Sequence, residues 1–438
     1  MRNGNDQDDE ASASRPDAPP LGAVAAVRAG AETPSAARAP RTPAFIFVFI
    51  TVLLDMLALG MIIPVLPRLV VDFLGGDTAR AAQIFGLFGT AWALMQFVFS
   101  PVQGALSDRF GRRPLILVSN FGLGFDYILM ALAPTLVWLF VGRVISGITA
   151  ASVATAYAYI ADVTPGEKRA ARFGLLGVAF GAGFVFGPAL GGLAGEVSPR
   201  LPFWIAAALS LANGLYGLLV LPESLPPERR AAFAWRRANP FGALVLLTSQ
   251  RQLSGLAAVS FLSNLAHASL PSISVLYMQY RYGWDQRTVG LTMAGVGLCA
   301  MIVQGGLIGR TVQRFGERTT LILGLGFGVA GFAVFGLAET GLIFWSGIPL
   351  LALWGLASPS ALGLMSRRVS ASEQGRLQGA NASLMGVANL LGPGLFTQVF
   401  ALFIGAGAAW QQPGAAFLLA AGLLVLAATV ALRATSRA

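Results

Sequence analysis

The stretch GALSDRFGRRPL, residues 104–115, places four charged side chains within six positions. It lies between two long apolar runs, in a chain of which only 11% of the residues are charged. A diluted copy, GRTVQRFGERTT, begins 205 residues later, at residue 309. A charged loop that returns between apolar runs indicates a duplicated chain.

The composition predicts a membrane protein. Hydrophobic residues make up 55% of the 438 positions and the mean hydropathy is +0.68, whereas soluble domains carry about 25% charged residues. Runs of about 20 apolar residues can cross a hydrocarbon core of about 30 Å, and lipid forces each of them to be helical. We predict an all-α fold with twelve transmembrane helices, at 44–67, 81–106, 114–134, 136–160, 171–195, 201–222, 253–280, 288–312, 319–338, 341–365, 376–404 and 409–432.

The basic residues predict the orientation of these helices. Of 30 Lys and Arg residues, 24 lie in the two termini and in every second connection, five lie in the other connections, and Arg143 lies inside a span. Positive charge concentrates on the cytoplasmic side of membrane proteins. Both termini and the 104–115 loop are therefore expected in the cytoplasm, and the net charge of +10 reflects this orientation instead of nucleic-acid binding.

The repeat predicts two bundles. A shift of 205 residues aligns the charged loops and also places Gly187 and Pro188 on Gly392 and Pro393. Six helices per copy give both copies the same orientation, as in transporters whose halves rock about a midplane substrate site. The predicted organisation is a disordered cytoplasmic tail (1–43), an N-terminal six-helix bundle (44–222), a cytoplasmic linker (223–252) and a C-terminal six-helix bundle (253–433).

Several classes of protein are disfavoured by what the sequence contains. One cysteine, Cys299, and one histidine, His267, leave no intramolecular disulfide and no cluster for haem, zinc or iron–sulfur binding. No nucleophile constellation or acidic metal motif is visible, so we expect no enzyme activity and no cofactor. A receptor without transport activity would not need buried charge.

Three ionisable residues lie at membrane depth, where each costs about 2.5–3.5 kcal/mol to insert. Asp55 has no partner within TVLLDMLALG and is the predicted proton carrier; the alternative is a structural carboxyl bonded to a neighbouring helix. Asp126 and Arg143 lie about equally far from the hairpin at 133–135. We predict that they pair, either to position substrate or as a purely structural ion pair.

Two segments are predicted to control gating. The first is the charged loop, a latch that biases one of two packings; for Arg112 and Arg113 the alternative is a role in orientation alone. The second is GAGFVFGPALGGLAG, where glycines recur at 183, 187, 191 and 195 and allow close helix approach, with simple packing as the alternative. The predicted gating residues are Gly104, Asp108, Arg109, Gly111, Arg112, Arg113, Gly183, Gly187, Pro188, Gly191 and Gly192.

These segments resemble a known family. GALSDRFGRRPL, VGRVISGITAAS and GFVFGPALGG resemble signature motifs of the major facilitator superfamily, the last of them typical of its proton-driven exporters. LLDMLALGMIIPVLP, ALMQFVFSP, GFDYILMALAP and QGRLQG are similar to the tetracycline efflux branch, over about 44–435. The resemblance implies a bacterial inner-membrane drug:proton antiporter that is functional as a monomer and exports tetracycline as a magnesium chelate. An exporter of an unrelated drug or metabolite is the alternative.

The resemblance also implies site residues. Residues that match those used by the family for transport, coupling or gating are Asp55, Gln96, Asp108, Arg112, Asp126, Arg143 and Gln304. We predict proton coupling at Asp55 and Asp126. The predicted substrate-binding residues are Asp55, Gln96, Asn120, Asp126, Arg143, Asn264, His267 and Gln304, of which Asn120, Asn264 and His267 are not carried over from the family. The chain departs from the tetracycline exporters at Ala300 and Gly328, where they carry a histidine and an aspartate. His267, beside Asn264, is a candidate replacement for that histidine, with a packing role as the stronger alternative.

Overall fold

The computed structural model describes residues 42–150, 152–231, 247, 251–370, 373–406, 408 and 410–436. Residues 1–41 of the predicted disordered tail lie outside these residues, as does most of the predicted linker, while residues 42 and 43 begin the first helix. The helices are α1 (Thr42–Ile62), α2 (Leu66–Phe73), α3 (Thr78–Phe110), α4 (Arg112–Leu132), α5 (Leu136–Thr149), α6 (Ser152–Val163), α7 (Gly166–Val197), α8 (Leu201–Val220), α9 (Arg251–Tyr282), α10 (Gln286–Ile302), α11 (Ile308–Leu337), α12 (Gly341–Trp354), α13 (Ala357–Ser366), α14 (Gln374–Ile404) and α15 (Ala415–Thr435). A 3-10 turn lies at Pro227–Arg229 and a π-helical turn at Val303–Leu307.

Eleven stretches of the described chain are long and apolar enough to cross a membrane. One of them, Gln286–Leu337, has 52 residues and would be about 78 Å long as one straight helix. It is broken at Gly316, whose φ of 77° is not helical. Split there, it makes two spans of ordinary length, and the predicted count of twelve follows.

The helix boundaries repeat with the same spacing as the sequence. Gly111, with φ 108°, separates α3 from α4 and is the 205-residue counterpart of Gly316. Positive φ is readily adopted only by glycine. The boundaries of α5 recur 205 residues later as those of α12. The duplication therefore extends from the sequence to the backbone.

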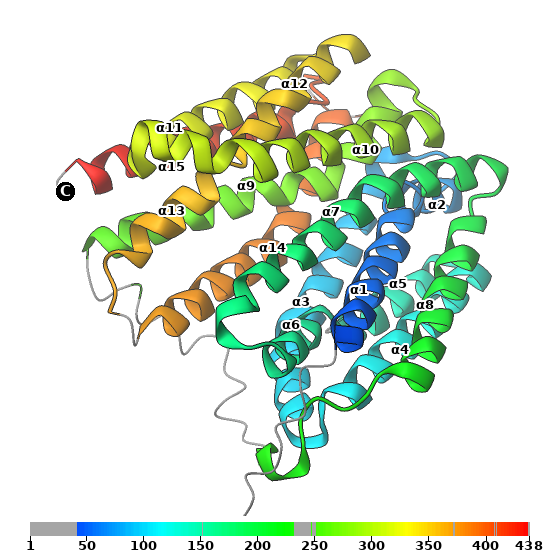
Figure 1. The fold of residues 1–438 in the computed structure, drawn as a ribbon. Coiled ribbons are helices and arrows are strands. Elements are labelled where there is room, and N and C mark those ends of the chain that lie inside the picture. Colours follow the sequence, from blue (N-terminus) through cyan, green and yellow to red (C-terminus); the bar gives the residue numbers. More distant parts are fainter. Residues whose placement is uncertain are drawn as a thin grey trace, which may run out of the picture. The chain divides into compact units, whose positions relative to one another are not determined.

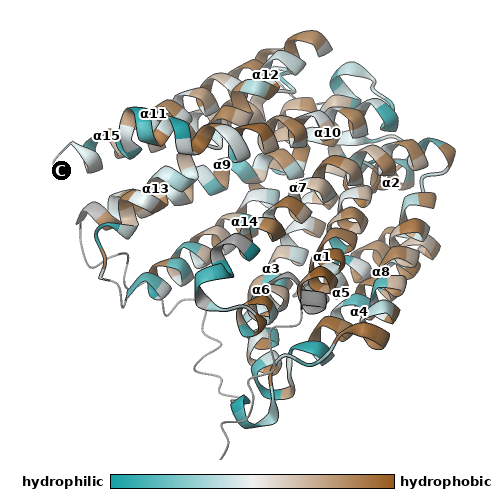
Figure 2. Cartoon of the chain, viewed as in Figure 1, coloured by the Kyte–Doolittle hydropathy of each residue, from teal (hydrophilic) through white to brown (hydrophobic). Residues whose placement is uncertain are grey.

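The packing follows the repeat. In the N-terminal bundle (α1–α8), α1 packs on α7 and α4 on α8; in the C-terminal bundle (α9–α15), α9 packs on α14 and α11 on α15. Two repeat-related pairs, α3 with α14 and α7 with α10, join the bundles (Figure 1). Hydrophobic residues cover the helices in Figure 2. Leu219 and Leu342 remain 76% and 75% exposed, as expected of side chains that face lipid.

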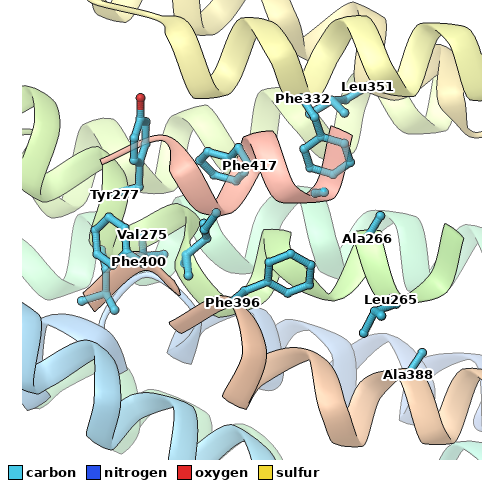
Figure 3. Close-up of a cluster of buried hydrophobic side chains, with 14 of the residues drawn as sticks. Leu265, Ala266, Val275, Tyr277, Phe332, Leu351, Ala388, Phe396, Phe400 and Phe417 are labelled. Carbon is cyan, nitrogen blue, oxygen red and sulfur yellow. The ribbon is translucent and has the colours of Figure 1, made fainter. Parts of the chain in front are cut away.

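The core of the C-terminal bundle is aromatic (Figure 3). Tyr277 of α9 lies edge-on to Phe417 of α15, with ring centroids 5.0 Å apart. Its hydroxyl donates to the carbonyl of Phe335 at 2.9 Å, so the polar end of this buried ring is satisfied. These contacts hold α9, α11 and α15 together and fix the position of α9.

Candidate functional site

Asp55 lies in the middle of α1 and is 4% exposed. Asn213 of α8 is fully buried, and its amide Nδ2 donates to Asp55 Oδ1 at 3.0 Å and to the Thr51 carbonyl at 3.1 Å. A buried carboxyl that is hydrogen-bonded to a neighbouring helix was one of the two interpretations of Asp55. Asn213 was not among the predicted residues, although an amide inside the apolar run of α8 is itself an unusual signal.

Asp126 and Arg143 do not form the predicted ion pair. A Cβ added at Gly142 would lie 2.9 Å from Asp126 Oδ1, so the carboxyl of α4 packs against the α5 backbone at Gly142. Successive residues are about 100° apart around a helix, so Arg143 leaves α5 on a different side from Gly142. Its guanidinium donates instead to Ser146 Oγ at 3.3 Å. Among the described residues, both Asp126 oxygens are buried without a hydrogen-bond partner.

Further polar side chains are buried in the N-terminal bundle. Tyr127, next to Asp126 on α4, is 1% exposed. Asn120, one to two turns before Asp126 on α4, is fully buried, and no described group is hydrogen-bonded to its amide. Because polar groups at this depth are costly, the interior of this bundle is a candidate functional site.

The C-terminal bundle contributes a different surface. The side chain of His267 on α9 is exposed. Whether it contacts substrate or has the packing role stays a prediction. Its ring lies 5.7 Å from that of Trp354, and Asn264, one turn earlier, is partly exposed.

The two predicted glutamines lie on the bundle-joining helices. Gln96 of α3 is partly exposed, and Gln304 is exposed on the π-helical turn at Val303–Leu307. Single π-helical turns are frequent at functional sites. Ala300 lies just before this turn, in the last residues of α10.

The charged loop binds its own bundle. Arg112 forms ion pairs with Asp108 at 2.5 Å and with Asp162 of α6 at 3.1 Å. Glu223 accepts hydrogen bonds from the backbone N–H groups of Arg112 and Arg113, at 2.8 and 3.3 Å. The sequence analysis missed Asp162 and Glu223. The contacts found for this loop keep it within the N-terminal bundle, so the predicted latch between bundles stays a prediction.

The remaining loop residues have local roles or none. The Arg113 guanidinium donates to the Leu218 carbonyl at 2.7 Å. Arg109 lies over the Phe110 ring, 5.1 Å from its centroid. A Cβ added at Gly104 would meet no atom within 4 Å, so no crowding in this conformation explains that glycine.

The second loop carries the same ion pair with its charges exchanged. Glu317 and Arg367 lie 3.1 Å apart, and they are the 205-residue counterparts of Arg112 and Asp162. Each pair ties the start of one span to the end of the next. The repeat therefore conserves the contact while reversing its polarity.

The glycines of α7 serve two contacts. Gly183, Gly187 and Gly191 face α1, where Gly60 approaches so closely that a Cβ on it would lie 2.9 Å from the Gly187 Cα. Gly192 instead faces α10, where a Cβ on it would lie 2.4 Å from the Gln286 carbonyl oxygen. Pro188 contacts both helices, with its ring near Gly60 of α1 and its carbonyl oxygen near Gly290 of α10. The gating prediction for α7 thus divides into a packing face and a face between bundles.

The bundles pack closely at one end of these helices. At the contact between α3 and α14, which the repeat relates to that between α7 and α10, a Cβ at Gly89 of α3 would lie 2.8 Å from Pro393 of α14. At the opposite end of the same helices, added Cβ atoms at Gly177 of α7 and Gly375 of α14 would meet no atom within 4 Å. These two glycines therefore contact no neighbouring helix, and the same end of the helices carries the 104–115 loop.

Comparisons with known proteins agree with this architecture. Residues 48–393 match the sequence profile of the Major Facilitator Superfamily. The tetracycline resistance protein of class C from Escherichia coli is 37% identical over 377 residues, covering 86% of this chain and 94% of that protein. The crystal structure of the human organic anion transporter MFSD10 (TETRAN) has a TM-score of 0.66 and 26% identity, covering 90% and 99% of the two chains. A D-xylose-proton symporter has the same fold, with a TM-score of 0.70 at 17% identity over 89% and 96%.

Proposed function

The chain belongs to the major facilitator superfamily, and we propose that it exports small-molecule drugs, tetracycline among them, in exchange for protons. The observation that carries the proposal is the buried contact between Asp55 of α1 and Asn213 of α8. An ionised carboxyl accepts hydrogen bonds only, whereas a protonated one is also a donor. Gain and loss of a proton at Asp55 therefore changes which contacts between α1 and α8 are favourable.

Asp126 is the second proton-coupling residue in this proposal. Its carboxyl lies against the α5 backbone at Gly142, the residue before Arg143. A change of charge there alters the electrostatic environment of Arg143 and of any substrate beside it. The two acids thus link proton binding to α1, α4, α5 and α8.

The closed and open ends fit alternating access. The basic 104–115 loop lies at the open end, and basic loops favour the cytoplasm. We place both termini and this open end on the cytoplasmic side of a bacterial inner membrane. In the opposite conformation, the loops at this end approach each other and complete the latch, with the chain acting as a monomer.

The substrate would bind between the bundles. Arg143, Asn264, His267, Gln96, Asn120 and Gln304 are the proposed contacts, and magnesium would arrive with tetracycline as part of the substrate, with no resident cofactor. The second candidate is an unrelated drug or metabolite. Arg143, a cation inside α5, favours an organic anion in that case.

Proton-driven uptake of tetracycline into proteoliposomes tests the proposal. With an imposed acid-inside gradient, we expect the wild type to accumulate drug and Asp55→Asn to lose gradient-driven accumulation, because Asn cannot exchange a proton. Asp72→Asn, at an ion pair with Arg68 near the end of α2, is the matched control and should retain activity. Full activity of Asp55→Asn would remove Asp55 from the mechanism, and wild-type uptake that ignores the gradient would refute the coupling.

A further inference from the structure

A small cavity lies between α3, α4 and α5, next to the charged loop that joins the first two of these helices. Its volume is about 230 Å³, below the about 300–1,000 Å³ that is typical of sites for drug-sized ligands. The walls include Val102 and Leu106 of α3, Leu115 and Val118 of α4, and Thr149 at the end of α5. We call this cavity the α3–α5 groove. Its size fits a segment of a chain molecule better than a whole drug.

The two polar side chains that line the groove are turned to the protein itself. They are Gln103 and Ser119. The Gln103 amide donates to the carbonyl of Ile148, and the Ser119 hydroxyl donates to that of Thr149. Both carbonyls belong to the last turn of α5, where a helix leaves its carbonyl groups without partners of its own. With these groups paired, the remaining surface of the groove favours an apolar occupant.

The groove opens toward the lipid-facing side of the N-terminal bundle. Val118 lines it and is 63% exposed. Phe125 and Leu132 follow on α4 at intervals of seven residues, and they are 64% and 59% exposed. Residues at this spacing lie on one face of a helix. A row of exposed apolar side chains along a membrane-spanning helix faces lipid, so an acyl chain can enter the groove directly from the bilayer.

An exposed cation lies one turn from the groove. Arg109 follows Leu106 by three residues on α3, and side chains at that spacing are neighbours on a helix surface. The Arg109 side chain is exposed, and none of the ion pairs among the described residues includes it. Arg112, at the start of the opposite wall, is paired with Asp108 and Asp162. Arg109 therefore keeps a positive charge that is available to an anion.

The second bundle repeats the cation but changes the walls beside it. Arg314, the 205-residue counterpart of Arg109, lies over the phenylalanine that follows it in the same way, 5.5 Å from the ring centroid compared with 5.1 Å. The leucines on both walls of the groove are replaced there by threonines. These are Thr311 and Thr320, in place of Leu106 and Leu115. The two loops therefore share a charge, and only the first of them has it beside an apolar cavity.

We propose that the α3–α5 groove binds one anionic glycerophospholipid. Part of an acyl chain fills the cavity, and the phosphate lies beside the Arg109 guanidinium, which can donate two parallel hydrogen bonds to it. An apolar cavity that opens to the bilayer and ends one turn from an exposed cation matches a ligand that is itself apolar at one end and anionic at the other. Bound in this way, the lipid joins α3, α4 and α5 where α5 ends. Such binding does not depend on which molecule the protein exports.

Native mass spectrometry of the purified full-length protein measures this binding. Phosphatidylglycerol is the probe, phosphatidylcholine with the same acyl chains is the comparison, and glycerol 3-phosphate tests the headgroup without chains. We expect the wild type to retain one phosphatidylglycerol in preference to phosphatidylcholine and to bind no glycerol 3-phosphate. Arg109→Gln should raise the Kd for phosphatidylglycerol about fivefold, the effect of one basic residue near a membrane surface. Arg314→Gln removes the same charge from the repeated loop and, as the matched control, should leave this Kd unchanged.

A second pair of variants tests the cavity. Val118→Trp places a large ring at the mouth of the groove, on an exposed position where folding should not suffer, and should raise the Kd for both lipids about tenfold by keeping two or more methylene groups out. Phe125→Trp, on the same face of α4, is its matched control and should bind both lipids as the wild type does. Circular dichroism checks that each variant is folded.

Three results would overturn the site. The first is unchanged binding of phosphatidylglycerol in either Arg109→Gln or Val118→Trp. The second is equal weakening by Arg109→Gln and Arg314→Gln, which would show attraction to basic charge in general. The third is binding of glycerol 3-phosphate as tight as that of phosphatidylglycerol, which would leave the acyl chain without a role.

Discussion

Gly290 of α10 offers a direct test of how the bundles meet. A Cβ at this position would lie 2.3 Å from the Pro188 carbonyl oxygen and 3.0 Å from the Gly192 Cα. Ordinary contacts begin near 3.4 Å, so Gly290→Ala forces the backbones of α7 and α10 apart by about 1 Å. Both contacting atoms belong to the backbone, and no rotamer change relieves the overlap.

Overpacking of this kind costs about 1–3 kcal/mol. If only the present conformation contains the contact, the substitution shifts its population about 5- to 150-fold toward the alternative. Gly295→Ala is the matched control, because a Cβ at Gly295 on the same helix meets no atom within 4 Å. We expect Gly290→Ala, and not the control, to open this end of the molecule.

Spin labels at Val197 and Arg287, both exposed at the close-packed end, measure the opening in a Cys299→Ser background. In the wild type the distance distribution should be dominated by one short population. Gly290→Ala should add a longer one and slow transport. An unchanged distribution together with unchanged transport would refute the assignment of α7 and α10 as a moving interface.

Three further predictions follow from individual contacts. Asn213→Leu removes the donor to Asp55 and should lower the free energy of unfolding by about 1–3 kcal/mol. It should also slow proton-driven uptake at least tenfold, since the carboxyl loses this hydrogen bond to α8; a variant with wild-type uptake contradicts this. Arg367→Glu should lower the free energy of unfolding by up to about 1 kcal/mol, the scale of a surface ion pair. Adding Glu317→Arg, which exchanges the two charges, should restore most of this stability in a double-mutant cycle. A double variant that is no more stable than the single one argues against the ion pair. Hydrogen bonds from Thr288 lower the pKa of Asp285 at the start of α10. The stabilisation from this cap is therefore present above the ordinary pKa of about 3.9 and is lost as the pH falls through the lowered pKa. Asp285→Ala should lower the free energy of unfolding by about 1 kcal/mol at pH 7 and by much less in strong acid, as thermal unfolding at both pH values would show.

The sequence predicted the helices well because lipid leaves the backbone few choices. Apolar runs of sufficient length must be helical in a membrane, and the predicted runs correspond to the observed spans. The glycines at 111 and 316 were visible as a repeat, and both proved to be breaks with positive φ. The long stretch Gln286–Leu337 is likewise divided into two spans at Gly316, a glycine that belongs to the repeat.

The candidate site was only partly predictable. The cost of burying charge identified Asp55, Asp126 and Arg143 without any structure. This cost depends on how deep a residue lies in the membrane, and it does not reveal in which direction the side chain points around the helix axis. Asp126 and Arg143 share a depth, yet the carboxyl faces Gly142 while the guanidinium reaches Ser146.

By itself, the sequence determined what depends on the solvent and on chain order: twelve membrane helices, their duplication and the acids that they carry. Only the tertiary structure decided which side chains meet. Asn213 binds Asp55 across 158 residues, and His267 of α9 lies beside Trp354 of α12, because helices distant in the chain are brought together by packing. Hydropathy and spacing encode where a helix must lie in the membrane, whereas partners are set by the rotation and crossing of helices, which depend on all of their neighbours at once.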